Sequence, residues 1–562
     1  MFHSITFTQV GLLFFTALFL SILFVPLTIR LAHRLGVVDH PSARSSHSRV
    51  VTRLGGLGIA GAFVISFMLF IPLNEFFWGF LSGFFIILLT GLADDFLNVH
   101  HRWKFVGEIL AALVFIAMTG ETLENLGNFL GGGVIHAGAF AIPLTVFCMV
   151  GGMNALNLVD GLDGLAAGIA AIALTFFTYL AWKVQAPYLM IISVAMLGAL
   201  LGFLRYNSHP ARLFMGDTGS LLLGYTLSVI LVRGSQIDDA AVPLAAWVLV
   251  VGLPLLDILL VMGRRIMHGE SPFSPDRTHL HHRLLLARLP HAAVVGVIYF
   301  VTALFGWLAI GLLGFPDWVM FAGLFILGFV VYSAVFELQH AADKPRDHWE
   351  NRFLRGSRQQ LDRLRTRLRR VSFHTAPVST TLMILLVLPS LFYPVIALQR
   401  SQTLALLMLA GIVVLLCLNV KKENKAILHG VVYVALMSLI FLYNLAPDES
   451  GRWLHVYVGV LSALSAAWIA LKLLLRTAAV PLKTSSFELL ILFISAFLPL
   501  VFFDELHFPE HTVEAGRFAA LEAIPLLIVS KIYFQYDNDK HTWLVRLFAL
   551  TIAVVAVRGY FA

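Results

Sequence analysis

Four short segments of this 562-residue chain concentrate carboxylate, amide and imidazole side chains between long apolar runs. One reads NALNLVDGLDG over 154–164, where Asn154, Asn157 and Asp160 recur every three residues. At a helix end this spacing aligns amide and carboxylate oxygens along one face. Such hard oxygen ligands suit Mg²⁺, which keeps several waters and binds substrate phosphates. We therefore expect a metal and phosphate site here, rather than a turn that is only structural.

A second segment places Asp94 and Asp95 at the end of an apolar run, with Lys104 following. Adjacent residues on a helix point about 100° apart. One carboxylate can therefore face a metal or phosphate while the other faces a basic partner. A pair of helix-end charges that only fixes topology is the alternative.

The third segment, FMGDTGS over 214–220, places Asp217 just ahead of another apolar run. A carboxylate and backbone amides meet where a helix begins, and such a place can hold a metal and a phosphate together. The alternative is an ordinary helix cap.

The fourth segment contains His279, His281 and His282 beside Arg283. Clustered imidazoles suggest zinc, but the segment has no Cys and no pair of His residues four apart on a helix. Phosphate binding, or proton transfer near neutral pH, explains His beside Arg better. A solvated polar loop is the alternative.

The composition is that of an integral membrane protein. Hydrophobic residues make up 59% of the chain and charged residues 13%, against about 25% charged in soluble domains. The net charge of +7 comes from short loops between apolar runs, which favours retention of loops on the cytoplasmic side over nucleic-acid binding. Cys148 and Cys417 both lie in apolar runs and are expected to be packing residues.

Windows of roughly 20 apolar residues, the length that crosses a bilayer, recur along the whole chain. They predict an all-α, polytopic transmembrane helical bundle with about eleven spans up to Leu338 and about seven after Val378. The first, Val10 to Ile29, is expected to be an uncleaved span. An arginine-dense polar stretch divides the chain into a core over 1–340, a basic cytoplasmic linker over 341–376 and a second membrane domain over 377–562.

Threading the predicted spans alternately across the membrane separates the loops of the core by charge. The loops of one set contain only two basic residues, Lys183 and Arg233. By the positive-inside rule the other set is cytoplasmic, which places the N-terminus outside and all four polar segments on the cytoplasmic side of the membrane. The basic set contains Arg30, Arg34, Arg44, Arg49, Arg53, Arg102, Lys104, Arg205, Arg212, Arg264, Arg265, Arg277, Arg283 and Arg288.

Taken in this order, the four segments resemble the polyprenyl-phosphate N-acetylhexosamine-1-phosphate transferase family over about residues 1–340. The HxHH form of 279–282 is similar to the branch that starts O-antigen, enterobacterial common antigen and teichoic acid linkage units. The peptidoglycan branch has a longer His run and ranks second. One departure is that Val51, Thr52 and Arg53 precede the glycines 55 and 56, where the family usually has Thr-Pro.

The resemblance implies a role for each matching residue. Asp217 and Asn157 would bind Mg²⁺, for which Mn²⁺ is a substitute, and Asp94 and Asp95 would orient or deprotonate the lipid phosphate with Lys104 as a phosphate contact. The uridine would be held by Asp160, Asp163, Asn207 and Phe214, and the other substrate-binding residues would be Asn154 and Arg53. The pyrophosphate side would be lined by His279, His281 and His282.

The implied reaction joins undecaprenyl phosphate to the sugar phosphate of a UDP-N-acetylhexosamine, N-acetylglucosamine being the first choice, and releases UMP. The expected partners are these substrates and the lipid bilayer but no nucleic acid, with a homodimer or contacts to polysaccharide-assembly proteins left open.

A transporter is the main alternative function, yet a transporter predicts ionisable residues at mid-span and inverted repeats. The acidic residues instead cluster at one set of helix ends; Asp257 is an exception, toward the end of its apolar run, and it can be a partner of a site residue. The function of the region after Val378 stays open, a receptor or scaffold role included.

Overall fold

The structure is a computed structural model that describes residues 7–39, 50–71, 74–129, 131–237, 242–271 and 278–343, together with a few residues between 457 and 465. The chain divides into two compact units, and the helices below belong to the first, Met1–Lys344 with Ser485–Leu490. Nearly all of the predicted linker and second membrane domain lie outside the described residues, as do Arg44, Arg49 and Arg277. The domain boundaries therefore stay a prediction.

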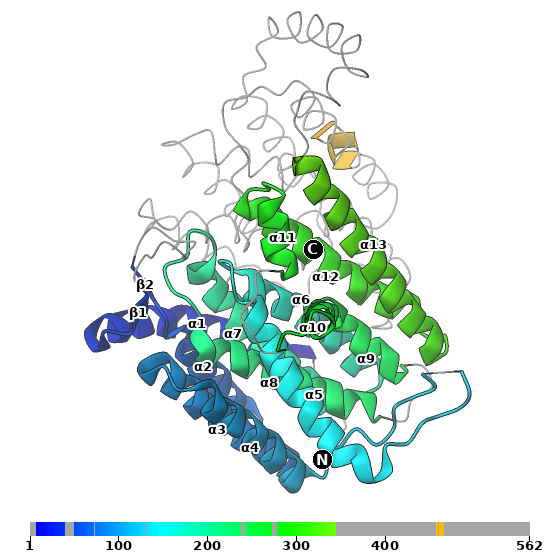
Figure 1. Ribbon diagram of the computed structural model, residues 1–562. Helices are drawn as coiled ribbons and strands as arrows, with labels where there is room; N and C mark the ends of the chain where they lie inside the picture. Colours follow the sequence, from blue (N-terminus) through cyan, green and yellow to red (C-terminus); the bar gives the residue numbers. More distant parts are fainter. Residues whose placement is uncertain are drawn as a thin grey trace, which may run out of the picture. The chain divides into compact units, whose positions relative to one another are not determined.

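The described part of the first unit is built from α-helices, which confirms the all-α prediction (Figure 1). Its only sheet among these residues is a two-residue hairpin of β1 (Val38–Asp39) and β2 (Val51–Thr52). The helices are α1 (Phe7–Leu35), α2 (Gly55–Phe70), α3 (Glu75–Leu97), α4 (His101–Thr119), α5 (Ala141–Val159), α6 (Leu165–Lys183), α7 (Pro187–Asn207), α8 (Gly216–Ser235), α9 (Leu244–Val250), α10 (Gly252–Met267), α11 (Leu280–Leu286), α12 (His291–Gly311) and α13 (Asp317–Asp343), with the 3₁₀ turn Gly138–Phe140 leading into α5.

Seven of the described helices are long and apolar enough to cross a membrane. Helices α9 and α10 are bent by 78° where they join and form an eighth candidate if they are taken as one span. Helix α2 has 16 residues and falls short. Each predicted apolar segment of the core overlaps a described helix, although α4 and α8 do not pass the same test of length and apolar character. The apolar helices support a polytopic protein, and how many of them cross the bilayer stays a prediction.

Burial separates central helices from peripheral ones. The most apolar window of α6 is 89% buried and that of α7 is 83% buried, whereas those of α1 and α13 are 22% buried. Helix α6 begins LAAGIAAIA, and small residues of this kind let helices approach closely inside a membrane. Helix α1 packs on α2 and α7, α3 packs on α4 and α8, and α5 packs on α8, so that α7 and α8 connect the two sides of the bundle.

Two glycines bring α2 and α3 against the beginning of α8. A Cβ added at Gly91 in α3 would lie 2.4 Å from the Cα of Thr218, and one added at Gly56 in α2 would lie 2.3 Å from the backbone nitrogen of Gly219. Neither position can take a side chain without moving a backbone. The segment 216–220 is therefore held between α2 and α3 by direct backbone contact.

The loops that are poor in Lys and Arg meet at one end of the bundle. The side-chain oxygen of Gln236 accepts from the backbone nitrogens of Glu124 and Asn125 at 3.0 and 2.8 Å. Asp317 accepts from the backbone nitrogens of Asn128 and Ala245 at 2.8 and 3.0 Å. These bonds join the 120–137 loop to the end of α8 and to the beginning of α13, and Asp317 also bonds to the beginning of α9. The division of loops by charge places the same segments on one side of the membrane.

We expect Gly91→Ala to destabilise the protein, because overpacking costs about 1–3 kcal/mol and exceeds the roughly 0.5–1 kcal/mol that Ala gains over Gly in a helix. Gly263→Ala in α10 is the matched control, since its Cβ would meet nothing within 4 Å. Thermal unfolding of both variants in detergent measures the difference. An unfolding temperature of Gly91→Ala equal to that of Gly263→Ala would contradict the close contact of α3 with α8.

Candidate active site

Asp95, in the last turn of α3, holds the first turn of α8. Its two carboxylate oxygens accept from the backbone nitrogens of Asp217 at 2.9 Å and Thr218 at 3.0 Å, and from the Thr218 hydroxyl. A carboxylate in this position satisfies helix-start amides and meets the positive end of the helix dipole. Gly216 has a φ of +70°, and a Cβ there would lie 2.5 Å from an Asp95 oxygen. Asp95 thus positions Asp217, and its predicted contact with the lipid phosphate stays a prediction.

Lys104, in the first turn of α4, lies between two carboxylates. Its ammonium group contacts Oδ2 of Asp217 and lies 3.8 Å from Oδ2 of Asp94. The three side chains are 15%, 31% and 21% exposed, so a substrate can still reach them. Residues predicted from two separate segments therefore meet where α3 ends and α4 and α8 begin.

Asn157, near the end of α5, is attached to the same turn of α8. Its amide nitrogen donates to Oγ of Ser220 at 2.8 Å, and Ser220 in turn donates to the backbone oxygen of Gly216 at 3.2 Å. This bond fixes the orientation of the amide and leaves the carbonyl oxygen, the atom that a metal would bind, at the opposite side of the group. Asn157 and Asp217 are thereby held on neighbouring helix ends.

Asn154 lies one turn earlier in α5 and contacts α4 instead. Its amide nitrogen donates to the carboxylate of Glu108 and to the backbone oxygen of Val150. Glu108 is fully buried. Glu108 was not among the predicted site residues, although a lone carboxylate inside an apolar run indicates a buried polar contact. The predicted substrate contact of Asn154 stays a prediction.

Asn207 is buried at the end of α7, where its side chain joins two loops. Its oxygen accepts from the backbone nitrogen of Gly164 at 3.0 Å, and its nitrogen donates to the backbone oxygen of Leu213 at 2.9 Å. With 2% of its surface exposed, it supports the DGLDG loop. Its direct contact with uridine stays a prediction.

Phe214 and Arg53 lie on backbone segments that run side by side. The backbone nitrogen of Phe214 donates to Thr52 at 2.8 Å, and its oxygen accepts from Gly55 at 3.0 Å. The Arg53 guanidinium pairs with Asp39 at 2.9 Å and is 39% exposed. The loop that departs from the family pattern is therefore attached to the start of α8, with its arginine at the surface.

Asp160 follows α5 and interacts electrostatically with Asp95 and Asp163. Burial raises its pKa to about 7, with further contributions from the negative charges of Asp95 and Asp163. Its carboxyl group can therefore exchange a proton near neutral pH.

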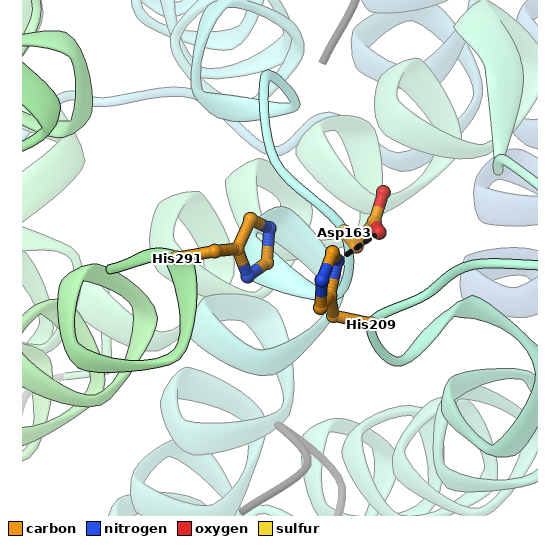
Figure 2. Close-up of side chains that lie close together, drawn as sticks. All are labelled: Asp163, His209 and His291. Atoms are coloured by element: carbon orange, nitrogen blue, oxygen red, sulfur yellow. Dashed lines mark hydrogen bonds and ion pairs between the residues drawn. The ribbon is translucent and has the colours of Figure 1, made fainter. Parts of the chain in front are cut away.

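Asp163, on the same loop, bonds to residues outside the four segments. Its Oδ2 lies 2.7 Å from Nδ1 of His209 and accepts from the backbone nitrogen of Ala211 at 3.0 Å, and His291 stacks on His209 (Figure 2). Neither histidine was among the predicted site residues, because their partners are distant in sequence and no local spacing indicates them.

His279 is held by a buried carboxylate. Its Nδ1 lies 2.8 Å from Oδ2 of Asp257, whose Oδ1 accepts from the backbone nitrogen of Leu280 at 2.9 Å and from the hydroxyl of Tyr332 at 2.7 Å. These bonds fix the imidazole and direct its Nε2 away from Asp257. The interpretation of Asp257 as a partner of a site residue is confirmed, whereas Tyr332, in the apolar α13, gave no signal in the sequence.

His281 packs against the DGLDG loop. A Cβ added at Gly161 would lie 2.5 Å from its Nε2, which explains why a glycine is required there. The side chain is 3% exposed. Burial, followed by the neighbouring His282, lowers the pKa of His281 to about 3, so the imidazole is neutral at physiological pH. The rings of His282 and His281 lie against each other at a tilt of 40°, with centroids 4.1 Å apart.

The sequence of this chain is similar to those of known proteins. Residues 77–235 match the model of glycosyl transferase family 4. A Bacillus subtilis protein named as a probable undecaprenyl-phosphate N-acetylglucosaminyl 1-phosphate transferase is 33% identical over 315 residues, which cover 56% of this chain and 88% of the relative. The decaprenyl-phosphate N-acetylglucosaminephosphotransferase of Mycobacterium tuberculosis H37Rv is 34% identical over 354 residues, 57% of this chain and 86% of its own.

The undecaprenyl-phosphate alpha-N-acetylglucosaminyl 1-phosphate transferase of Escherichia coli K12 is 28% identical over 336 residues, which cover 58% of this chain and 89% of the relative. The chain belongs to glycosyl transferase family 4. It is an enzyme of the phosphoglycosyltransferase class, and the family resemblance inferred from the four segments is confirmed.

We expect Asp95→Asn to lower stability more than Asp94→Asn. Both Asp95 oxygens accept from α8, so an amide must place its NH₂ group against an N–H donor, at a cost of about 1–3 kcal/mol. Asp94→Asn loses only a partly exposed ion pair, worth about 0–1 kcal/mol. Thermal unfolding in detergent compares the two, and equal losses would show that Asp95 does not hold α8.

A second expectation concerns His281, whose pKa falls from 6.5 to about 3 on folding. Between these values the unfolded chain binds a proton that the folded chain excludes, so stability is retained above pH 6.5 and is lost as pH falls. The slope approaches about 1.4 kcal/mol per pH unit. Unfolding temperatures from pH 7 to pH 4 should fall less steeply in His281→Gln than in the wild type. The exposed His101→Gln is the control, and an unchanged slope in His281→Gln would contradict the buried neutral imidazole.

Proposed function

We propose that this protein transfers N-acetylglucosamine 1-phosphate from UDP-N-acetylglucosamine to undecaprenyl phosphate, releases UMP and starts a lipid-linked cell-surface polysaccharide. The observation that carries the proposal is the meeting of Asp94, Lys104 and Asp217 at the ends of three helices, beside Asn157. The names of the relatives support the substrates. Nucleotide sugars are cytosolic and the polyprenyl chain lies in the bilayer, so a site at helix ends facing the cytosol can reach both.

The donor atoms fit the predicted Mg²⁺. The Asp217 carboxylate and the Asn157 carbonyl oxygen are hard oxygen ligands, few in number, which suits an ion that takes its other ligands from water and phosphate. When bound, the ion would neutralise the diphosphate and the departing UMP. Lys104 balances the carboxylate charge at the same place and can move its ammonium group to a phosphate oxygen of the substrate.

The residues around this point orient the reactants. Asp94, beside Lys104, can orient the lipid phosphate and accept a proton from it. A lipid phosphate oxygen attacks the phosphorus that carries the sugar, the bond from that phosphorus to the UMP oxygen breaks, and UMP departs with the electron pair. Asp95 and Ser220 act indirectly, since they hold Asp217 and Asn157 in position.

The imidazoles line the other side of the DGLDG loop. His279, oriented by Asp257 and Tyr332, can present Nε2 to a diphosphate oxygen, and His281 supports the loop as a neutral side chain. Arg53, exposed next to the start of α8, can contact the donor, and Phe214 can stack on its base.

We expect Asp217→Asn and Asn157→Ala each to reduce Mg²⁺-dependent UMP release by about a hundredfold or more, equivalent to about 2.7 kcal/mol of transition-state stabilisation. The assay uses purified full-length protein, undecaprenyl phosphate and UDP-N-acetylglucosamine. Glu75→Gln, in the first turn of α3 at its other end, is the matched control and should turn over like the wild type.

Wild-type turnover by Asp217→Asn or Asn157→Ala would refute the metal assignment, and a wild-type rate in the presence of a chelator would refute the metal requirement. A panel of UDP-sugars in the same assay tests the choice of N-acetylglucosamine. Faster transfer from UDP-N-acetylgalactosamine or from a 6-deoxy sugar would replace the proposed donor without removing the reaction class.

A further inference from the structure

Three metal-ligating side chains converge next to the candidate active site, two of them without a role in the proposed transfer. Asp163 comes from the loop between α5 and α6, His209 from the segment after α7, and His291 from the first turn of α12 (Figure 2). One ligand atom from each lies within 4.8 Å of the other two. The three segments are far apart in sequence, so the fold itself brings these groups together.

The three ligand atoms lie near enough to one another to be brought onto a single ion. Nδ1 of His209 lies 2.7 Å from Oδ2 of Asp163, and the rings of His209 and His291 have centroids 4.1 Å apart with planes at 23°. Ligand atoms around a tetrahedral Zn²⁺ are about 3.4 Å apart, given bonds of about 2.0–2.1 Å. Both imidazole rings must turn out of their stacked arrangement before their lone pairs can meet at one ion, and the His209 side chain, 47% exposed, has room to rotate.

The surroundings of His291 provide the second observation. Neither its Nδ1 nor its Nε2 has a hydrogen-bond partner among the described residues, although both atoms are buried. A buried polar atom without a partner costs free energy, and an ion that accepts the lone pair of one of them removes that cost. Asp163 itself is 7% exposed, so its charge also gains from a cation.

We propose that Asp163, His209 and His291 bind a divalent transition-metal ion, with Zn²⁺ as the preferred occupant and a fourth coordination position left to water or another ligand. Imidazole and carboxylate ligands suit Zn²⁺ and its neighbours, whereas Mg²⁺ prefers oxygen ligands alone. The site is therefore chemically distinct from the oxygen site at Asp217 and Asn157.

Binding would join three segments of the bundle through one ion. Because Asp163 belongs to the DGLDG loop, the ion would also immobilise that loop against α12 and the end of α7. On coordination the ion takes the place of the proton shared by His209 and Asp163, so binding should weaken as pH falls. The inference does not depend on the proposed substrates, because its test measures metal and not turnover.

The test measures metal bound to purified full-length protein after loading with Zn²⁺ and removal of free ion, and the visible absorption of the protein titrated with Co²⁺. Wild type should retain about one Zn²⁺ per chain. His209→Ala, His291→Ala and Asp163→Asn should each weaken binding by at least the roughly 10–100-fold that loss of a supporting partner costs a metal site. Gel filtration in detergent checks that each variant is folded.

His101→Ala is the matched control, because the rings of His100 and His101 are also in contact, with centroids 4.0 Å apart, but both residues are exposed. It should bind Zn²⁺ like the wild type. Loss of metal in His101→Ala alone would assign the ion to that exposed pair and overturn the proposal. Retention of equal Zn²⁺ by His209→Ala and His291→Ala, or no retention by the wild type, would also overturn it and leave the three residues as a hydrogen-bonded and stacked group.

Discussion

The bond between the Asp95 carboxylate and the first turn of α8 is the constraint on which the site depends. It joins the end of α3 to the start of α8 and fixes the backbone of Asp217. The glycines at 56, 91 and 216 make the bond possible, because any side chain there would separate the helices. Lys104 and Asn157 then reach the same turn from α4 and α5. Four helix ends thus become one polar site.

Charge in such a place is costly unless it is paired, since polar groups at helix ends of a membrane protein lose much of their hydration. Ion pairs and hydrogen bonds offset this cost. Lys104 balances Asp94 and Asp217, and backbone amides satisfy Asp95. On the histidine side, Asp257 accepts from a tyrosine and a backbone amide while it bonds to His279. Both clusters are held tightly enough to orient a substrate, yet Asp217 keeps an exposed edge.

Much of this arrangement could be predicted from the sequence. Apolar windows located the helices, charge separated the loops into two sets, and oxygen-rich spacing located the residues that gather at α8. The hydrogen-bond partners of Asn207, Asn154 and Asp95 could not be predicted, because each partner is distant in sequence. Tyr332, His209 and His291 were missed for the same reason: their partners are distant in sequence, so no local spacing indicates them. The bend between α9 and α10 was also missed, since the window of apolar residues runs through it.

The account requires that all four polar segments lie on the cytosolic side of one membrane. Single cysteines at exposed His100, Arg212 and Met267, and at Val134 in the 120–137 loop, can be introduced after Cys148 and Cys417 are replaced. They can then be labelled with an impermeant maleimide in right-side-out and inverted vesicles. The account predicts that the first three react only in inverted vesicles and that position 134 reacts only in right-side-out ones. Labelling of positions 100 and 212 from opposite sides would contradict a shared site.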